Sequence, residues 1–594
     1  MLRVEGGRVV GMFPTLTETL RAAATATPEG GLHFLDRKEQ TTVVSWAEVL
    51  QRASRVASGL HSLGLKPGER VGLIFPTNIG FFEGFFGALL AGGVPTPLYP
   101  PARLGRMEDY HERTARMLRA AGVKVALLDP MVRRVIGPTI QRARPPLGAF
   151  TLDELPTDGG PAPAPNEDPN ALAMVQFSSG TTVDPKPVAL THRAVLAQTE
   201  AIALQVLQLD PNARAGVSWL PLYHDMGLIG CVFPALAQAG ELTLIGPEQF
   251  LARPALWLRA LSRTRAVASP APNFAYAYCL QRVTDDELDG VDLSAWRLAL
   301  NGAEPVSPDT LRGFNLRFAR WGLRPEALTP VYGLSEASLA VTFADVATPF
   351  QTLHVDRVRL AEGLAVPDPE GVELVSVGRP VLAFEIELRG ADGLDPLPDG
   401  QVGRLFVAGP SLMRGYLDQP EATARALVGG WLDTGDLGFL WEGQLFLVGR
   451  AKDVLILRGR NHPPHPVEQS VDTLPGVRAG CAAAVSFRPE GADHELLLLF
   501  IEQKADARAE DLAALPEAAA QAALLATGLR PDEVIVLAPG TLPRTSSGKI
   551  RRGEALRQFT EGRLLPPEEV GALKIAGLMA RSWLAFAQMR LKGP

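Results

Sequence analysis

Two loops rich in small hydroxyl residues and glycine, each carrying a lysine, lie far apart in this chain. One spans Leu542–Arg552 and contains Lys549, and the other spans Ser178–Lys186. Loops of this kind expose backbone N–H groups to phosphate oxygens, and a lysine adds a mobile positive charge. Together they predict nucleotide chemistry that is completed when a second domain closes over the first.

The size and composition of the chain fit a globular protein with more than one domain. Its 594 residues exceed what a single core usually supports. A net charge of −7 without long basic runs argues against nucleic acid as a partner. Cys231, Cys279 and Cys481 are too far apart to suggest a metal site or a disulfide framework, which favours a reducing, cytoplasmic environment.

No segment has the pattern of a signal peptide or a membrane span. The first residues lack an apolar core, and the most apolar stretch, residues 71–91, is interrupted by Pro76, Asn78 and Glu83. That stretch predicts a buried strand over 71–75 followed by a buried helix over 79–91. We therefore expect no membrane crossing.

The first half of the chain alternates between short apolar strands and helical patterns. The alternation covers about residues 15–155 and again 190–345, and it predicts parallel sheets flanked by helices. A connecting loop rich in Pro, Gly and acidic residues is expected over 155–170. The strand expected over 171–177 then leads directly into the Ser178 loop, where an α/β sheet presents backbone donors to a ligand.

The second half changes character. Short strands and tight turns over about 375–448 predict a small barrel or a distorted sheet. A compact α+β segment with an Ala-rich helix near 517–526 follows Arg450. We therefore expect an α/β fold with a large N-terminal domain, made of two α/β subdomains and a small β-barrel-like subdomain, followed by a small α+β domain.

Seven stretches carry the small, aromatic and charged residues of a nucleotide site. They are VQFSSGTTVDPKPVALTH (175–192), WLPLYHDMGLIG (219–230), NGAEPV (301–306), YGLSEAS (332–338), WLDTGDLG (431–438), VGRAKDVLILRGRNHPPHPVE (448–468) and LPRTSSGKIRR (542–552). In this order they resemble the motifs of the acyl-adenylate-forming enzymes, and most of all those of the fatty acyl-AMP ligases. The resemblance implies a ligase that uses ATP and Mg²⁺ to convert a fatty acid into an acyl adenylate, releasing pyrophosphate.

The resemblance also implies the residues of the site. Those assigned to ATP are Ser178, Ser179, Gly180, Thr181, Thr182 and Lys186 for the β- and γ-phosphates, Asn301, Gly302, Ala303 and Glu304 for the adenine wall, Tyr332 and Gly333 for the base, Ser335 for the α-phosphate, and Asp436 and Arg450 for the ribose. Glu336 would bind Mg²⁺, because a hard cation prefers carboxylate oxygens. Taken singly, the first loop could be an ordinary polar loop, Glu336 a helix-start carboxylate and Asp436 a turn residue.

Lys549 and His224 are the catalytic residues that the resemblance implies. The Lys549 ammonium would bridge the carboxylate and the α-phosphate, two anions that otherwise repel each other. His224 would lie at the carboxylate–phosphate junction, although a lone histidine can also be a satisfied structural group. We find no Asp or Glu placed to receive an amino-acid ammonium, and apolar neighbours such as Trp219 and Met226 favour an uncharged acyl tail.

Lys452 matches the position of the hinge in this family. The implied domains are an N-terminal adenylation domain over 1–449, a hinge over 450–453 and a mobile C-terminal lid over 454–594 that carries the catalytic lysine. The chain departs from the family pattern at Val183 and Pro187, where glycine is usual. A β-branched residue resists φ > 0 and proline lacks an N–H donor, so the first loop is expected to differ in geometry.

Two features resemble the fatty acyl-AMP ligases rather than ordinary acyl-CoA ligases. The segment between Tyr332 and residues 377–380 is longer than its counterpart in ordinary acyl-CoA ligases by about one hairpin. Its residues 353–363 are similar to an insertion that, in the fatty acyl-AMP ligases, limits movement of the lid and productive use of CoA. The stretch 459–464, GRNHPP, resembles a second signature of that family. The implied acyl acceptor is the phosphopantetheine thiol of an acyl carrier protein in lipid or polyketide/peptide assembly.

Several alternatives remain open at this point. The longer segment could be a loop length without functional meaning, and the enzyme could then be a long- or medium-chain acyl-CoA synthetase. A non-catalytic binding module is a third possibility, supported only by Val183 and Pro187, whereas Lys549, Asp436 and Glu336 argue against it. Taken singly, Lys549 could be a surface lysine in a basic tail with Arg551 and Arg552. The tail over 566–594 predicts an amphipathic helix with basic residues, which could contact a membrane or a carrier protein but more often packs against its own domain.

Overall fold

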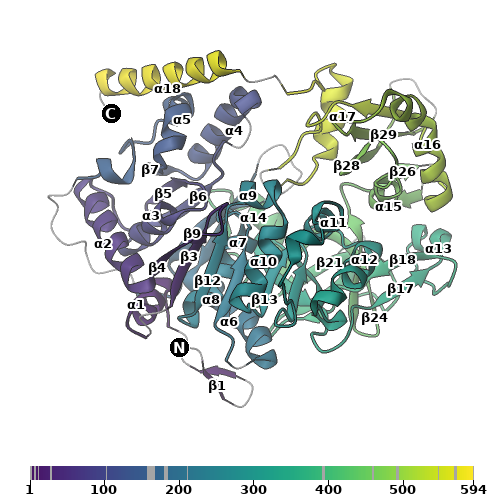
Figure 1. The fold of residues 1–594 in the computed structure, drawn as a ribbon, viewed down its shortest axis with the longest axis horizontal. Coiled ribbons are helices and arrows are strands. Elements are labelled where there is room, and N and C mark those ends of the chain that lie inside the picture. Colours follow the sequence, from purple (N-terminus) through teal and green to yellow (C-terminus); the bar gives the residue numbers. More distant parts are fainter. Residues whose placement is uncertain are drawn as a thin grey trace.

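The computed structural model describes residues 3–592 apart from 6–7, 11–12, 27–29, 102–103, 157–166, 179–184, 211, 391–392, 394, 458–459, 490–493, 546–547 and 568–570. The predicted phosphate-loop residues Ser179, Gly180, Thr181 and Thr182, together with Val183 and most of the 155–170 loop, lie outside the described residues. The described part forms an α/β body with the C-terminal α+β part beside it (Figure 1).

The largest sheet has parallel strands in its middle and antiparallel strands at its edges. Its strands follow the order β19–β16–β15–β14–β13–β11–β12–β3–β4. The bounds are Arg379–Pro380 (β19), Ala340–Phe343 (β16), Leu328–Gly333 (β15), Leu298–Asn301 (β14), Ala268–Ala271 (β13), Ala215–Ser218 (β11), Glu241–Ile245 (β12), Gly31–Leu35 (β3) and Thr41–Ser45 (β4). Parallel neighbours require crossover connections, which are mostly helices here.

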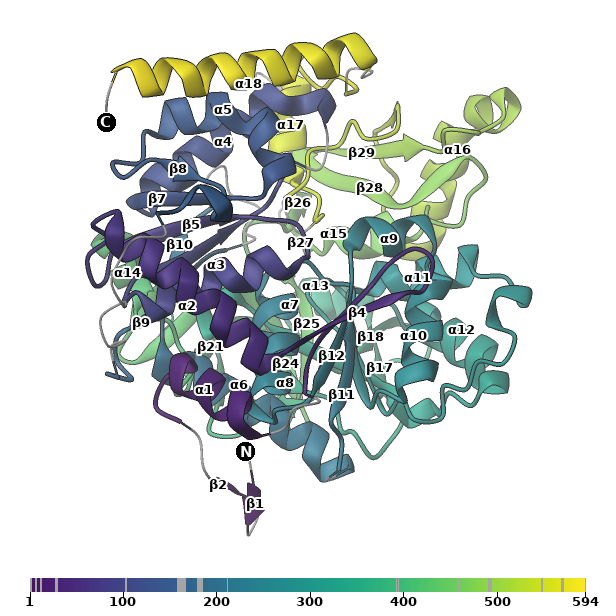
Figure 2. The same ribbon diagram turned by 60° about the vertical axis from the view of Figure 1, so that its left-hand side comes forward.

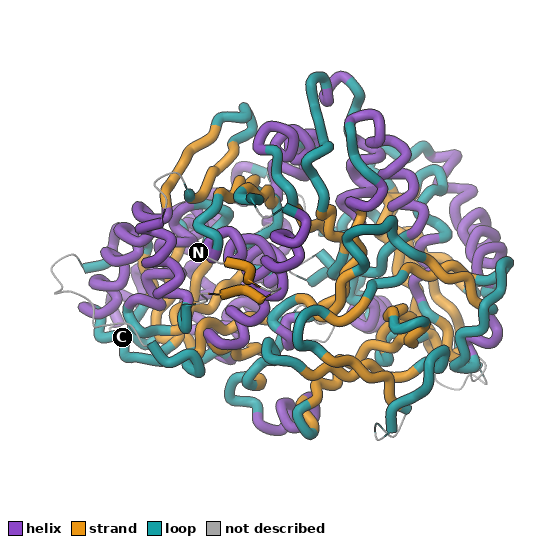
Figure 3. Tube along the Cα trace, turned by 90° about the horizontal axis from the view of Figure 1, so that it is seen from below, coloured by secondary structure: helices purple, strands orange, loops and turns teal. Residues whose placement is uncertain are grey.

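Helices cover both sides of this sheet, as Figures 1 and 3 show. They include α1 (Leu16–Ala26), α2 (Trp46–Ser62), α6 (His192–Leu209), α8 (Phe233–Ala237), α9 (Pro247–Ala252), α10 (Ala255–Thr264), α11 (Asn273–Arg282) and α12 (Pro308–Phe318). The strand–helix alternation expected from the sequence is confirmed.

A second parallel sheet is built by the chain between β4 and the first predicted loop. Its order is β6–β5–β7–β8, with bounds Val94–Leu98 (β6), Arg70–Ile74 (β5), Val123–Leu128 (β7) and Ala149–Phe150 (β8). The helices α4 (Met107–Ala120) and α5 (Pro130–Ala143) belong to this subdomain. The apolar stretch 71–91 forms β5 and the buried helix α3 (Ile79–Leu90), as expected.

Glycine lets α3 approach α2 closely. A Cβ added at Gly87 would lie 2.6 Å from side-chain atoms of Val56 on α2, well inside the contact distance of real side chains. Phe81, Phe82 and Phe85 of α3 are fully buried, and the rings of Phe82 and Phe85 contact Phe34 on β3 and Phe233 on α8. Because α3 is buried within the protein, it carries apolar residues on nearly all sides. Its sequence therefore resembles that of a membrane-spanning helix, although it is part of the core.

The chain continues into smaller antiparallel sheets that carry the predicted motifs. One is β22–β10–β9, with bounds Gly415–Tyr416 (β22), Pro187–Thr191 (β10) and Leu172–Phe177 (β9), and the other contains Glu385–Arg389 (β20), Gly403–Ala408 (β21), Trp431–Trp441 (β24), Leu427–Val428 (β23) and Gln444–Arg450 (β25). Register shifts at Leu437/Gly438 and Arg404/Phe406 distort the second sheet, in agreement with the irregular sheet expected over 375–448.

The inserted segment forms a hairpin with a core of its own. Strands β17 (Thr352–Val355) and β18 (Val372–Val375) pair antiparallel, and the short helix α13 (Arg357–Ala361) lies between them in sequence. Val355 and Leu360 pack against the stacked rings of Phe439 and Phe446. The insertion is therefore a folded element fixed to the β20–β25 sheet.

The C-terminal part is an α+β unit around a three-stranded sheet of described strands, β28–β29–β30. Its elements are β26 (Leu455–Leu457), β27 (Arg460–His462), α15 (Pro464–Gln469), β28 (Val477–Phe487), β29 (Leu496–Gln503), α16 (Ala509–Thr527), β30 (Glu533–Leu537) and α17 (Arg552–Thr560). The Ala-rich helix near 517–526 is present within α16, which begins earlier than expected.

The last helix, α18 (Ala572–Lys592), packs on a different part of the molecule. It runs along the outside of α5 in the N-terminal body rather than against the C-terminal unit (Figures 1 and 2). The sequence favoured packing of this helix against its own C-terminal domain. No sequence pattern indicated that the helix would pack on α5 of the N-terminal body. Among the described residues, no helix combines the length and apolarity that crossing a bilayer requires.

Candidate active site

A cavity of about 560 Å³ opens between the large sheet, the β20–β25 sheet and the C-terminal unit. Its lining brings together predicted site residues that are far apart in sequence. They are Ser178, Lys186, His224, Ala303, Tyr332, Gly333, Ser335, Glu336, Arg450, Lys452 and Lys549. The residue types predicted to bind phosphate, base, ribose and metal thus face one common space.

Lys549 reaches this space from a tight turn of the C-terminal unit. The Thr545 N–H donates to the Lys549 carbonyl (2.8 Å), and the Lys549 N–H donates to the Thr545 hydroxyl (3.1 Å). Burial and the neighbouring Arg450 guanidinium lower the pKa of Lys549, whereas Asp225 and Glu304 oppose that shift. The lysine therefore lies among several charged groups in a partly buried space, where electrostatic interactions are stronger than in water.

The Arg106 side chain links the C-terminal unit to the N-terminal body. Arg106, from the short helix η1 (Leu104–Arg106) of the N-terminal body, donates to the carbonyls of Thr541 (3.2 Å) and Leu565 (2.9 Å). Thr541 lies a few residues before Lys549 in sequence. The pose in the structure therefore places the lysine over the cavity.

His224 is oriented by a carboxylate that sequence analysis missed. Its Nδ1 lies 2.6 Å from Asp225 Oδ1, and the other carboxylate oxygen accepts a 2.5 Å hydrogen bond from the Ser335 hydroxyl. Burial opposes the charge of Asp225, but His224, Ser335 and Lys549 together lower its pKa to about 2. The Met226 N–H donates to the same Nδ1 (3.4 Å), and the buried Nε2 of His224 has no hydrogen-bond partner among the described residues.

A second buried network surrounds the predicted ribose residue, Asp436. Tyr332 donates to its Oδ2 (2.6 Å), and the Arg450 Nε donates to its Oδ1 (3.1 Å). Gly435, at φ 73°, makes the turn that points this aspartate back toward Tyr332. The strands β24 and β25 pair Asp436 with Arg450 directly. The carboxylate is thus held rigidly next to the cavity.

Glu336 sits on η7 (Ser335–Ala337) at a wall of the cavity. Burial raises its pKa, and the Tyr416 hydroxyl donates to its Oε1 (2.9 Å). The Lys186 ammonium lies 4.3 Å from the centre of the Tyr416 ring, and burial lowers the pKa of this lysine. Tyr416 therefore connects the predicted metal ligand with the predicted phosphate lysine, and no sequence signal pointed to it.

A single hard carboxylate oxygen donor fits Mg²⁺, which usually takes one or two protein carboxylates together with substrate phosphates and waters. Groups of three or more His, Cys, Asp and Glu side chains that could hold a metal by themselves do not occur among the described residues. The donor set at Glu336 therefore fits a cation brought in with a phosphate ligand.

Three predicted wall residues lie behind the surface of the cavity. Asn301 is fully buried and donates from its side chain to Asn273 (3.1 Å). The Glu304 carboxylate accepts from the Phe274 N–H (2.6 Å), and burial raises its pKa. A Cβ on Gly302 would meet Val331 at 2.7 Å. Of the NGAE stretch, Ala303 alone appears in the lining among the described residues.

Part of the cavity lining is apolar. This part comes mainly from α6, the short helix α7 (Asp225–Gly227), β14, β15 and β16, with Gly230 from the π-helical turn η3 (Leu228–Val232). Its side chains include Ile202, Met226, Val331, Leu339 and Phe343. Asp225 also lines the cavity, but His224, the Met226 N–H and Ser335 already bind its oxygens. The pocket therefore favours an apolar tail over an ammonium group.

The predicted hinge is anchored on one side. Lys452 is exposed at the cavity, whereas the next residue, Asp453, lies 3.5 Å from Arg552. Arg552 also binds Glu468 of α15 through two contacts of 2.6 and 2.5 Å. Arg551 is buried. The two arginines after the Lys549 loop thus belong to the packed interior of the C-terminal unit rather than to a free basic tail.

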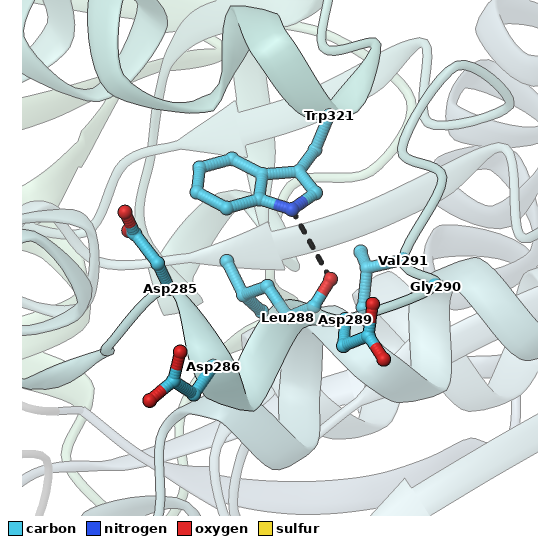
Figure 4. Close-up of a pocket in the computed structure, with 7 residues that line it drawn as sticks. All are labelled: Asp285, Asp286, Leu288, Asp289, Gly290, Val291 and Trp321. Atoms are coloured by element: carbon cyan, nitrogen blue, oxygen red, sulfur yellow. Dashed lines mark hydrogen bonds between the residues drawn. The ribbon is translucent and has the colours of Figure 1, made fainter.

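A separate hollow of about 460 Å³, which shares no lining residue with this cavity, lies beside the short helix η4 (Asp286–Leu288). Figure 4 shows its three aspartate side chains pointing apart and the Trp321 indole donating to the Leu288 carbonyl (3.1 Å). Asp285 is paired with Arg317 and Arg320. The carboxylates do not converge, and the hollow lacks the features of a binding site.

Comparisons with known proteins agree with the geometry. The AMP-binding enzyme family matches residues 20–417. A Caulobacter vibrioides protein whose name provisionally assigns it to the acyl-CoA synthetases is 36% identical, over 93% of this chain and 96% of its own. The long-chain-fatty-acid–AMP ligase FadD23 of Mycobacterium tuberculosis is 30% identical over 92% of this chain and 96% of its own.

Solved structures give the same result. A chain from a study of fatty acyl-adenylate ligases of E. coli and L. pneumophila superposes with a TM-score of 0.86 at 34% identity, covering 93% of this chain and 98% of that one. The predicted fold, with a large N-terminal and a smaller C-terminal part, is confirmed by this match. This chain is an acyl-adenylate-forming ligase of the AMP-binding enzyme family, in its fatty acyl-AMP ligase branch.

Proposed function

We propose that this protein activates a fatty acid with ATP and passes the acyl group to the thiol of an acyl carrier protein. In the first step a carboxylate oxygen of the acid forms a bond to the α-phosphorus of ATP, while the bond from that phosphorus to the β-phosphate oxygen breaks. Pyrophosphate leaves and an acyl adenylate remains. The proposal rests on one observation: Lys549, His224 and Ser335 line the same cavity, whose lining is partly apolar and partly polar.

Each polar residue of the cavity has a separate proposed role in this step. Lys549 draws the two anions together and stabilises the charge of the pentacoordinate transition state. His224, held by Asp225, would position the attacking carboxylate, and Ser335 would donate to the α-phosphate. Ser178 and Lys186 remain the proposed phosphate contacts of the first loop, alongside Ser179, Gly180, Thr181 and Thr182.

The nucleotide would be fixed by its base and ribose. Ala303, Tyr332 and Gly333 would bound the adenine, with Asn301, Gly302 and Glu304 supporting that wall from behind. Asp436 would accept hydrogen bonds from the ribose hydroxyls, and Arg450 would hold its carboxylate in place.

Glu336 would hold a Mg²⁺ ion, which when bound supplies positive charge to the departing pyrophosphate. The protein's own contribution is to keep this carboxylate in place through the Tyr416 hydroxyl. We propose an N-terminal domain over 1–449, a hinge over 450–453 that contains Lys452, and a C-terminal domain over 454–594, whose last helix, α18, returns to the N-terminal body.

The insertion supports a carrier-protein acceptor rather than free CoA. Glu362, which follows α13, lies 3.8 Å from Arg460 in the RNH stretch of the C-terminal unit. This exposed ion pair contributes little energy by itself, but it shows that the insertion contacts the unit that would have to turn. A folded hairpin packed against that unit would restrict the pose needed for CoA.

A product analysis tests the proposal. The protein is incubated with ATP, Mg²⁺ and a panel of fatty acids, alone, with CoA, and with a phosphopantetheinylated carrier protein, and the products are identified by mass spectrometry. We expect fatty-acid-dependent pyrophosphate release, acyl adenylate, and transfer to the carrier but little to CoA. Accumulation of acyl-CoA would favour the synthetase alternative, and absence of pyrophosphate release would favour a non-catalytic binding module.

Gly230→Leu is expected to shorten the acyl chain that the enzyme accepts. Gly230 lies on η3 in the lining of the cavity, and a Cβ there would meet the Leu339 side chain at 2.8 Å. A leucine would fill apolar space that a longer tail occupies, with a cost of about 1–3 kcal/mol for the excluded tail atoms. Pyrophosphate release should fall about 10–100-fold for the longest substrate and change little for a short one. An equal loss for all chain lengths would place the acyl tail elsewhere.

A further inference from the structure

The inner face of α18 packs closely against α5 through specific hydrogen bonds. Pro138 lies inside α5, and the Gly137 N–H donates to the Ser582 hydroxyl (2.8 Å) while that hydroxyl donates to the Arg133 carbonyl (2.9 Å). Ser582 thus stands between two groups that would otherwise bond to each other within the helix. A Cβ on Gly137 would lie 2.3 Å from the Ser582 carbonyl, so the two backbones touch.

Further contacts hold the same face. Leu578 is buried in the core of the second parallel sheet, and the Arg133 guanidinium lies 4.3 Å from the centre of the Phe586 ring. The side chains of Gln141 and Gln588 are joined by a 2.8 Å hydrogen bond. The helix is therefore a fixed part of the surface, and its orientation decides which side chains face outward.

The outer face of α18, formed by Ile575, Met579, Trp583 and Leu584, is apolar and uncovered. Ile575, Met579 and Trp583 follow one another at intervals of four residues and so lie in one row along the helix. Trp583 is 70% exposed and Leu584 50% exposed. A helix that is apolar on two sides normally has a partner on both, but only α5 covers one of them among the described residues.

The charges that α5 and α18 themselves contribute are positive. Neither helix contains an Asp or Glu, and their described basic residues are Arg133, Arg134, Arg142, Lys574 and Arg581. Arg133 and Arg142 are paired with Glu154 and Glu108, which lie outside the two helices. Arg134 and Arg581 are exposed. Pairing of this face with the same face of a second copy would bring like charges together, which disfavours a self-association surface.

We propose that the outer face of α18 binds the surface of an anionic lipid bilayer. Aromatic and aliphatic side chains inserted at the headgroup level with basic residues beside them are the pattern of an interfacial helix. An indole is well suited to this depth, because its ring is apolar and its N–H can reach water. The helix lies flat on the protein through its joint with α5, so it would meet the membrane along its length without crossing it.

Vesicle binding tests this proposal on the full-length protein. Sedimentation is measured with vesicles of phosphatidylglycerol and phosphatidylcholine and with phosphatidylcholine alone, for the wild type and for Trp583→Ser/Leu584→Ser. We expect the wild type to bind the anionic vesicles, to bind the neutral ones less, and to be released by salt. The double variant should bind at least about tenfold more weakly. Leu316→Ser on α12, where the leucine is 83% exposed, is the matched control and should bind like the wild type.

The controls separate loss of the surface from loss of the fold. Neither Trp583 nor Leu584 lines the cavity, so pyrophosphate release with a short, water-soluble acid should be unchanged in the double variant. Vesicle binding that is absent in the wild type, or equal in the double variant, overturns the proposal. So does a dimer of the wild type that dissociates in the double variant, since the face would then belong to a second copy.

Discussion

Replacing Lys549 with alanine is expected to lower acyl-adenylate formation by about 10²–10³-fold without unfolding the protein. The side chain is half-buried at the cavity, and the backbone of Lys549 is hydrogen-bonded to Thr545 on the same turn. Alanine removes the charge that lets the carboxylate approach the α-phosphate and keeps that turn. Single-turnover formation of acyl adenylate, followed by mass spectrometry, gives the rate directly.

Two companion variants sharpen this prediction. Lys504→Ala changes an exposed lysine of the same unit and should leave the rate unchanged. Burial and Arg450 lower the pKa of Lys549, so the protonated form should be lost at a lower pH than for an exposed lysine. The rate of the wild type should fall as the pH rises through that pKa, and Lys549→Arg should lack the fall because arginine stays protonated. Near-normal turnover by Lys549→Ala would remove the lysine from the mechanism.

Asp225→Ala is expected to lower kcat by about 10²-fold and to destabilise the protein by about 3 kcal/mol. Without this carboxylate the buried His224 Nδ1 and the Ser335 hydroxyl lose their partner, and the histidine loses its orientation. Steady-state kinetics measure the first effect and urea unfolding at neutral pH the second. A loss of stability with full activity would show that the carboxylate serves the fold alone.

Asp225→Asn separates shape from charge. The amide keeps the size of the side chain and can still accept one hydrogen bond, so the variant should recover part of the stability and less of the rate. The pKa of Asp225 is lowered from 3.8 to about 2 in the folded protein, so its stabilising effect is present above the unfolded value and is lost as the pH falls toward 2. Asp225→Asn should lack this part of the acid sensitivity in unfolding experiments.

Much of the fold could be predicted from the sequence, because strands, helices and turns are indicated by local patterns of residues. The alternation of strands and helices, the buried stretch 71–91 and the irregular strands before Arg450 all appear where they were expected. Each rests on periodicity or turn residues within a few positions of one another. The order of the seven motifs likewise identified the family, because a match of residue types in order does not depend on knowing the contacts.

Tertiary structure alone decided which side chains work together. Asp225 bonds to Ser335 across 110 positions of the chain, and Tyr332 bonds to Asp436 across 104. Tyr416 stands between Lys186 and Glu336, and α18 returns to α5 through Ser582. Such pairs form only when separate sheets and helices assemble, and the free energy that selects them comes from burying whole surfaces rather than from any local pattern. The sequence by itself therefore determined the chemistry available to this protein, while the packing of distant segments determined which residues meet to perform it.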